Sequence, residues 1–304
     1  MSAFLLPGWS LRSARAGTTK SVLLGIALCL GFSYPSLAAD RKAKTPRLSA
    51  AQVVQKHVSA RGGLEAWRAV KTISLSGKMD AGAGDSIARS MRIARGATTR
   101  KEQREIAAKS VKPEPEKQVQ LPFKLAKERP NKSRLEIEFA GKTAVQVYDG
   151  TNGWKLRPFL GRNDAEPFTP QEAKSEAAEA EEMGDVLIDY KARGLKAELE
   201  GVEPVGGRDA YKLKLTSSAG TTRRVWIDAQ TFLDVKVEGV PRRMDGKMHS
   251  VFVYQSDFRS VQGLKIPFVT ETAVDGYPQS HKIIVEKVVV NPALPATTFA
   301  KPKA

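Results

Sequence analysis

Residues 209–238 read DAYKLKLTSSAGTTRRVWIDAQTFLDVKVE and contain three segments in which apolar and polar side chains alternate. The alternating apolar residues are Tyr211, Leu213 and Leu215, then Val225 and Ile227, then Leu233, Val235 and Val237. A period of two gives a β-strand one apolar face and one polar face. The breaks at 217–220 and 229–231 have the length of hairpin loops, so we expect three antiparallel strands. Another part of the molecule must cover their apolar face.

The same alternation predicts most of the remaining strands. They are expected at residues 72–79, 87–94, 119–127, 135–139, 142–148, 247–258, 264–273 and 280–290. With the first three segments, this pattern predicts ten or eleven short strands. Pro267 has no amide hydrogen, so its strand is expected to lie at an edge or to contain a bulge.

Two segments carry the signals of helix starts. Ser49 and Gln52 fit a capping box, and the amphipathic helix that follows ends at Gly62. Thr169 followed by Pro170 begins a central helix. Because helices and strands do not alternate along the chain, a parallel α/β fold is not expected. The expected class is α+β and mainly β.

Residues 1–38 have the pattern of a secretory signal peptide, in which basic residues precede an apolar run and small residues precede the cleavage point. Cleavage is expected after Ala38 or Ala39. The apolar run at 22–32 is shorter than the roughly 20 residues that span a bilayer, and an uncleaved anchor is the alternative. We expect a periplasmic protein with a linker at 39–47, a folded domain at 48–300 and a tail at 301–304.

The single cysteine, Cys29, lies inside that apolar run. Leu28 stands where a lipobox has a small residue, so lipidation of Cys29 is not expected. Removal of the signal peptide leaves a chain without cysteine. That excludes disulfides, thiolate metal sites and cysteine nucleophiles from the mature protein.

The chain is strongly basic, with a net charge of +16 that falls to +13 when the signal peptide is removed. This charge favours anionic partners, and export makes a membrane surface a better candidate than nucleic acid. A solvated basic surface that aids solubility is the alternative. Residues 100–117 are dense in charge and are expected to form a mobile excursion between strands. A basic loop that touches a membrane is the other interpretation of this segment.

No catalytic or metal-binding set stands out among the residues. His57, His249 and His281 lack metal-ligand spacing, and the sequence has no GxSxG, P-loop or GxGxxG motif. His57 lies on the apolar face of the first helix and is expected to be a core histidine with satisfied hydrogen bonds.

Three aspartates near strand ends are candidates for a carboxylate cluster, namely Asp149, Asp228 and Asp257. Turn chemistry explains each of them better than catalysis does. Three tryptophans have two interpretations, as the lining of a ligand cavity or as part of the hydrophobic core. They are Trp67, Trp154 and Trp226. Core is the favoured interpretation.

The layout as a whole resembles the LolA/LolB-like superfamily of periplasmic lipoprotein carriers. The resemblance is carried by GGLEAW at 62–67, PNKSRLEIEF at 130–139, VYDGTNGW at 147–154, the strands of 209–238 and DFRSVQGLKIPF at 257–268. It covers roughly residues 48–300. It implies an unclosed antiparallel β-barrel, capped by an N-terminal and a central helix around an apolar cavity.

The resemblance implies a non-enzymatic carrier or chaperone in outer-membrane lipoprotein sorting, which binds lipoprotein acyl chains or lipid and needs no cofactor and no metal. Expected cavity-lining residues are Val145, Val147, Leu213, Leu215, Val225, Ile227, Leu233, Val235 and Val237. An alternative is an envelope sensor that recognises lipoproteins and signals to a protein partner. An exported hydrolase that uses the three aspartates is the least favoured function.

Overall fold

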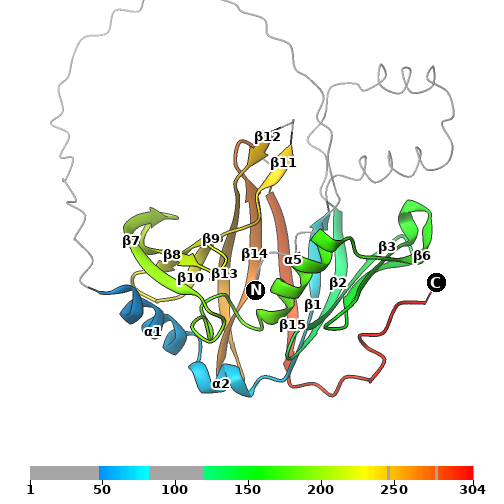
Figure 1. The fold of residues 1–304 in the computed structure, drawn as a ribbon, viewed down its shortest axis with the longest axis horizontal. Helices are drawn as coiled ribbons and strands as arrows, with labels where there is room; N and C mark the ends of the chain where they lie inside the picture. The colour runs from blue at the N-terminus through cyan, green and yellow to red at the C-terminus, as the bar shows by residue number, and fades with distance from the viewer. Residues whose placement is uncertain (1–47, 82–118, 245–246, 278–279, 304) are drawn as a thin grey trace, which may run out of the picture.

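The computed structural model describes residues 48–81, 119–244, 247–277 and 280–303 (Figure 1). Four sequence-based expectations lie outside the described residues, namely the signal peptide at 1–38, the linker at 39–47, the strand at 87–94 and the excursion at 100–117.

The described residues form three helices, a 3-10 turn and fifteen strands. The helices are α1 (Ala50–Ala60), α2 (Leu64–Ala69) and α5 (Pro170–Glu181), and the turn is η1 (Pro158–Leu160). The first six strands are β1 (Thr72–Ala81), β2 (Val119–Glu128), β3 (Lys132–Phe139), β4 (Lys142–Tyr148), β5 (Gly153–Arg157) and β6 (Arg162–Pro167). The next four are β7 (Lys196–Val205), β8 (Arg208–Thr216), β9 (Thr222–Asp228) and β10 (Asp234–Glu238). The last five are β11 (Arg242–Met244), β12 (Lys247–His249), β13 (Val251–Val261), β14 (Leu264–Val274) and β15 (Ser280–Val290).

Thirteen of these strands form one antiparallel sheet, in the order β6-β5-β4-β3-β2-β1-β15-β14-β13-β10-β9-β8-β7. Strands β11 and β12 form a separate hairpin. Because β6 and β7 are edge strands, the sheet does not close on itself, as expected. The number of strands exceeds the predicted ten or eleven. The main omission was β7, in which a bulge between Leu199 and Gly201 interrupts the alternation.

The predicted strands of 209–238 are confirmed as β8, β9 and β10, which pair antiparallel. Leu213 pairs with Val225, and Val225 pairs with Val237. The alternation expected in the third strand does not hold, because a bulge lies between Asp234 and Lys236. The bulge turns Asp234 inward together with Val237 and leaves Val235 half-buried.

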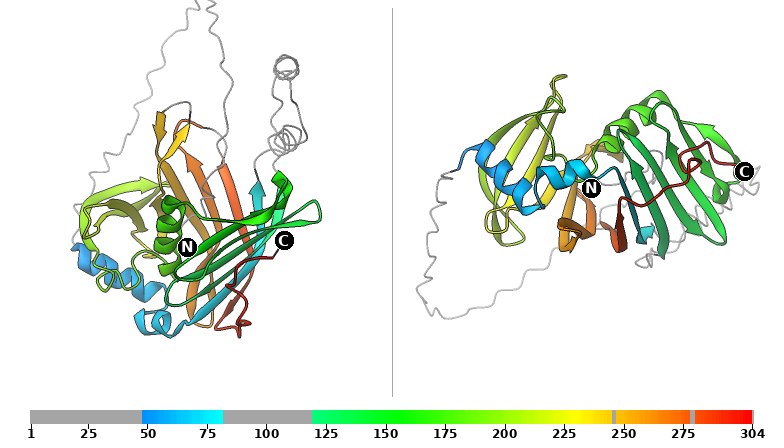
Figure 2. Two further views of the ribbon diagram at one scale, coloured as in Figure 1. Left: turned by 45° about the vertical axis from the view of Figure 1, so that its right-hand side comes forward. Right: turned by 90° about the horizontal axis from the view of Figure 1, so that it is seen from below.

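The helices cover one face of the curved sheet, called here the helix-covered face (Figures 1 and 2). Helices α1 and α2 lie across the open side of the curve, and α5 lies over β3 and β4. The C-terminal segment, residues 291–303, runs along the opposite face over the strands at the β2–β5 end (Figure 2). Both faces of this end of the sheet are therefore covered by chain.

The sheet contains a local gap between two neighbouring strands. Strand β14 pairs with β15 only through residues 269–273, whereas its first half, 264–268, pairs with β13 alone. In this first half the Lys265 amide donates instead to the Arg61 carbonyl at 3.0 Å. Pro267 lies in this half, so it occupies an edge-like position as its chemistry requires. The junction of α1 and α2 thus takes the place of a strand.

Candidate functional site

Helix α1 is positioned by its cap at one end and by a glycine at the other. The Ser49 hydroxyl accepts the Gln52 amide at 3.3 Å, and Gln52 Oε1 accepts the Ser49 amide at 2.8 Å, which is the predicted capping box. After the helix, Gly62 has φ +113°, and a Cβ on it would lie 2.5 Å from the Gly263 carbonyl oxygen. Only glycine permits this approach. The helix therefore ends directly against the β13–β14 turn.

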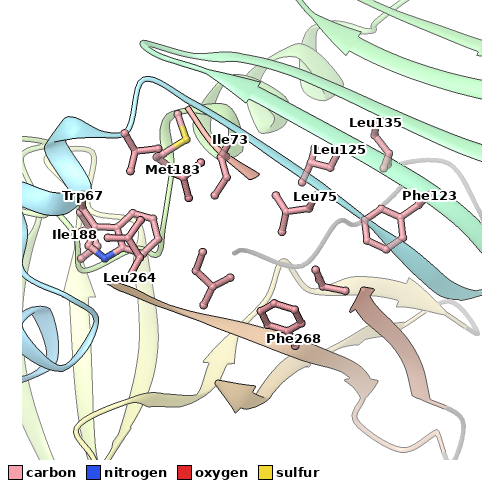
Figure 3. Close-up of a cluster of buried hydrophobic side chains, with 14 of the residues drawn as sticks. Trp67, Ile73, Leu75, Phe123, Leu125, Leu135, Met183, Ile188, Leu264 and Phe268 are labelled. Carbon is pink, nitrogen blue, oxygen red and sulfur yellow. The ribbon is translucent and has the colours of Figure 1, made fainter. Parts of the chain in front are cut away.

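Two hydrophobic clusters fill the space between the helices and the sheet. The central cluster consists of Trp67, Val70, Ile73, Leu75, Leu121, Phe123, Leu125, Leu135, Ile137, Met183, Ile188, Leu264, Ile266, Phe268, Val285 and Val290 (Figure 3). The α1 cluster consists of Val53, Val54, Val186, Leu187, Leu213, Leu215, Val225, Ile227 and Val237. Both clusters include residues from 182–195, the connecting segment between α5 and β7. Each fully buried aliphatic side chain of this size contributes roughly 1.5–3 kcal/mol.

A cluster of four buried charged residues joins α1 to the connecting segment and to β10. This buried charge cluster consists of His57, Arg61, Asp185 and Asp234, each at most 4% exposed. Arg61 donates from Nη1 to Asp234 Oδ1 at 3.0 Å and from Nη2 to the Gly184 carbonyl at 3.3 Å, and its Nε lies 3.4 Å from Asp185 Oδ2. Asp185 Oδ1 also accepts the Leu187 amide at 2.7 Å, which fixes the connecting segment.

His57 is surrounded by acceptors, so its ring must donate from both nitrogens. Nδ1 lies 2.9 Å from the Phe232 carbonyl oxygen, and Nε2 lies 3.2 Å from Asp185 Oδ2. Only the imidazolium form carries two donors. Burial alone would lower the pKa of His57, but the charge and hydrogen bond of Asp185, helped by Asp234, outweigh burial and raise it. Burial opposes ionisation of Asp185 as well, yet His57 and Arg61 hold its pKa far below the usual range. The cluster is then two cations and two anions.

A metal ion does not fit the buried charge cluster well. His57, Asp185 and Asp234 offer ligand atoms that lie within 4.8 Å of one another. However, the Arg61 guanidinium already contacts both carboxylates. A divalent cation would have to displace this guanidinium into an apolar interior, which is costly for a buried charge. The geometry favours a structural ion cluster, in line with the expectation that His57 is a core histidine.

Helix α5 is attached to the sheet by polar contacts. The predicted helix start at Thr169 is confirmed, and the helix has a capping box in which the Thr169 hydroxyl accepts the Glu172 amide at 3.3 Å. Lys155 Nζ donates to Glu172 Oε1 at 2.5 Å, and Ser133 Oγ donates to Glu176 Oε1 at 2.6 Å. Such contacts hold a helix of low apolar content at a fixed place over β3 and β5.

The interior under the helices is nearly filled. The cavity there has a volume of about 10 Å³ and is lined by Arg61, Trp67, Ile73, Leu75, Leu125, Lys127, Met183, Gly184 and Ile266. This space holds about one water molecule. A larger groove of about 540 Å³ opens to solvent on the opposite face and is lined by Arg134, Glu136, Lys142, Thr143, Val145, Leu156, Pro158, Asn163, Pro302 and Lys303. This small cavity does not confirm the acyl-sized cavity expected under the helices.

The expected lining residues fall into separate places. Five of them, Leu213, Leu215, Val225, Ile227 and Val237, lie together in the α1 cluster on the helix-covered face. Leu233 and Val235 are half-buried at the start of β10, where the bulge breaks the alternation.

Val145 and Val147 lie on the opposite face of the sheet. In the β3–β4 register they pair with Glu136 and Arg134, whereas the neighbouring residue Leu135 points into the central cluster. The two valines pack with Leu156 and with Phe299 of the C-terminal segment, and partly buried Trp154 packs against this group. The structure does not bring them together with the other lining residues. Alternation alone could not assign them to a face, because the C-terminal segment makes both faces of β4 apolar.

The three aspartates each have local partners. Asp149 Oδ1 accepts the Thr151 and Asn152 amides at 2.8 and 2.6 Å, and Asp228 Oδ1 accepts three donors from residues 230–231. Asp257 pairs with Arg259 at 2.6 Å. Turn chemistry is confirmed for the first two. Trp67 is fully buried in the central cluster, which confirms it as core.

Three members of the buried charge cluster were missed in the sequence. Arg61 reads as an ordinary basic residue at a helix end, and Asp234 falls in the polar phase of its strand. Asp185 lies in a segment without periodicity. Nothing in the local sequence marks these residues as buried, because their burial depends on contacts between segments more than a hundred residues apart.

No family model matches the chain, and no curated protein matches it. Solved structures do match. One is a LolA superfamily protein from Nitrosomonas europaea, 14% identical, with 84% of this chain and 98% of that chain covered and a TM-score of 0.50. Another is a DUF1329 family protein from Desulfovibrio piger, 11% identical, with 82% and 96% covered and a TM-score of 0.50. The chain has a LolA-like fold.

The LolA-like fold confirms the resemblance predicted from the sequence. A putative outer membrane lipoprotein-sorting protein domain from Vibrio parahaemolyticus also matches, with 11% identity, 82% and 95% coverage and a TM-score of 0.47. At such identities the likeness describes the fold alone. Every helix in the described part of the chain is too short or too polar to span a bilayer.

Proposed function

We propose that the protein is a non-catalytic periplasmic carrier that binds acyl chains of lipoproteins or lipids on the helix-covered face. The observation that supports this most directly is the construction of that face. Its two hydrophobic clusters are roofed by α1, α2 and the connecting segment, none of which belongs to the sheet. A roof of this kind can move while the sheet stays intact. The LolA-like fold supports the same function.

Binding in the small interior cavity requires that α1, α2 and the connecting segment move, because this cavity holds about one water molecule in this conformation. Separating α1 from β10 would expose the apolar clusters, at a cost that an acyl chain offsets by about 0.8 kcal/mol for each buried methylene. It would also return the buried charge cluster to water, and charged groups regain hydration there. We propose that this conformation is the closed one. We propose Leu213, Leu215, Val225, Ile227 and Val237 as residues that contact the cargo.

Export and location belong to the same proposal. The signal peptide at 1–38 would direct the chain to the periplasm, where cleavage after Ala38 or Ala39 releases the folded domain. A carrier function needs no cofactor and no bond-making chemistry. The local partners of Asp149 and Asp228 support a structural role for these carboxylates rather than a catalytic one.

The test is to purify the protein from its own envelope and to identify bound lipid by native mass spectrometry. The delipidated protein is then titrated with a fluorescent acyl probe. We expect saturable binding of the probe and co-purified lipid. The absence of both would overturn the proposed function.

A matched pair of variants localises the binding site. Leu213→Ala enlarges the space on the helix-covered face, and Val147→Ala does so on the opposite face. We expect the first to change the affinity for the probe and the second to leave it unaltered. Equal effects of the two variants would contradict the proposed site.

A further inference from the structure

The small interior cavity has a lining that a purely apolar cargo does not need. Six of its nine lining residues are apolar, and one is Gly184. The other two are the cations Arg61 and Lys127, which are 0% and 6% exposed. No carboxylate is among the nine. Asp185 and Asp234, which pair with Arg61, lie outside this lining, so the charged groups that line the cavity are both cationic.

Arg61 keeps one donor without an acceptor. Its Nη1 and Nη2 donate to Asp234 and to the Gly184 carbonyl, but Nε is buried and makes no hydrogen bond, although Asp185 Oδ2 lies 3.4 Å away. A buried polar group without a hydrogen bond is costly. The unsatisfied donor belongs to a side chain that lines the cavity.

Lys127 reaches the same cavity from β2. Its Nζ donates to the carbonyls of Glu179 and Glu182 at 2.7 and 3.1 Å, at the end of α5. Three carboxylates face Lys127, and all of them lie on or just after α5. They belong to Glu176, Glu179 and Glu182. Burial and the neighbouring Glu176 raise the pKa of Glu179 to about 8, so this carboxyl is protonated at neutral pH. Burial also lowers the pKa of Lys127, so an added anion would stabilise its charged form.

We propose that the cargo is an anionic amphiphile whose carboxylate or phosphate head group is bound by Arg61 and Lys127. This proposal rests on the proposed function, and it adds the chemical class of the cargo. The acyl chain would extend from the two cations along Leu75 and Leu125 toward Phe123 and Phe268, which belong to the same central cluster (Figure 3). Guanidinium and ammonium groups are the side chains that bind such head groups best.

The test compares anionic and neutral amphiphiles of equal chain length. Palmitate, hexadecyl phosphate and hexadecanol share a chain and differ in the head group. The delipidated protein is titrated with each, by displacement of a neutral acyl probe. We expect both anions to bind at least about tenfold more tightly than the alcohol, because a charge-assisted hydrogen bond replaces a neutral one. The ratio between the two anions identifies carboxylate or phosphate as the preferred head group.

The variant Lys127→Met removes one cation and keeps the length of the side chain. We expect it to lose most of the preference for anions while it still binds hexadecanol. Lys124→Met is the matched control, because Lys124 lies on the same strand but is exposed and pairs with Glu138 at 3.3 Å. Lys127→Arg retains the charge and should retain the preference, which covers the case in which Lys127→Met does not fold.

The possible outcomes distinguish this inference from the proposed function. Equal affinity for the anions and the alcohol in the wild-type protein would overturn the anionic class and leave the carrier function standing. A preference for anions that survives in folded Lys127→Met would overturn the role of Lys127. Failure of all three ligands to displace the probe, together with no binding of the probe itself, would remove the carrier function.

Discussion

Arg61 is a charged residue with no exposed side-chain surface, held by Asp185, Asp234 and the Gly184 carbonyl. Replacing it by methionine would remove the ion-pair partner of buried Asp234 and would leave Asp185 paired with His57 alone. We expect Arg61→Met to lower the free energy of unfolding by roughly 3–5 kcal/mol, the usual cost of breaking a buried ion pair from one side. Urea unfolding followed by circular dichroism measures the change.

The control is Arg259→Met. Arg259 pairs with Asp257 at 2.6 Å, but both side chains are largely exposed. Exposed pairs contribute little to stability, so the urea midpoint of this variant should stay near that of the wild-type protein. A similar shift in both variants would show that Arg61 does not act through its burial.

His57 makes a pH-dependent contribution to stability whose sign follows from its raised pKa. The unfolded chain has a histidine pKa near the ordinary 6.5, and the folded value lies above it. The stabilisation is therefore complete below pH 6.5 and is lost as the pH rises through the folded pKa. Asp185 behaves in the opposite way. Its pKa is depressed in the fold, so its contribution is present above its ordinary pKa of 3.8 and is lost as the pH falls through its folded pKa.

The measurement compares the wild-type protein with His57→Gln over a range of pH by chemical unfolding. We expect the stability difference between the two proteins to be largest between about pH 4 and 6.5 and to shrink at higher pH. A difference that stays constant through the alkaline range would mean that His57 is not held as the imidazolium.

The sequence predicts the helix caps, but it does not predict which charged residues are buried. The capping boxes at Ser49 and Thr169 depend on residues three positions apart, so the sequence was sufficient. The buried charge cluster depends on α1, the connecting segment and β10 meeting in space. No local pattern encodes that meeting, and the sequence identified only His57 as a core residue.

At the scale of elements, the junction between α1 and α2 is held against the β13–β14 turn by Gly62. An alanine there would adopt a strained backbone conformation, at roughly 1–3 kcal/mol. Its Cβ would also meet the Gly263 carbonyl oxygen at 2.5 Å, which adds roughly 1–3 kcal/mol of overpacking. We expect Gly62→Ala to lower the thermal midpoint clearly and to weaken amide-exchange protection in α1.

Gly63→Ala is the matched control. Gly63 also has a positive φ, of +91°, but a Cβ on it would meet no atom within 4 Å. It should show the cost of strain without the cost of the contact. If the two variants were equally unstable, the close approach of α1 to the turn would have no energetic weight.

Strand prediction was reliable where one face is apolar and the other is wet. Strands β8 and β9 follow this rule, and their pairing was correct. Strand prediction failed where a strand lacks this division into one apolar and one solvent-exposed face. Strand β7 has a bulge that interrupts its period, and β4 is apolar on both faces because the C-terminal segment covers one of them. Alternation of apolar and polar residues predicts that a segment is a strand. It does not predict which face of the strand packs against the helices when both faces are covered.

At the scale of the whole molecule, the positive charge predicts an affinity for anionic membranes. The full chain has a net charge of +16, and removal of the proposed signal peptide would leave +13. We expect it to co-sediment with vesicles that contain phosphatidylglycerol and to be released by salt, because charges separated by more than about 10 Å are screened at 0.1 M salt. Vesicles of phosphatidylcholine are the control. Equal binding to both, or binding that salt does not alter, would contradict an electrostatic attraction.

Strand β10 shares three residue pairs with β9 and three with β13, whereas β13 and β14 share ten. Under mechanical tension across the sheet, these two short ladders would yield before their neighbours. Arg61 and His57 bind Asp234 and the Phe232 carbonyl at the start of this strand. The end of α1 therefore supports the start of a strand whose two ladders are among the shortest in the sheet. Movement of α1 away from the sheet would leave β10 held by these two short ladders alone, while the sheet keeps its strand order.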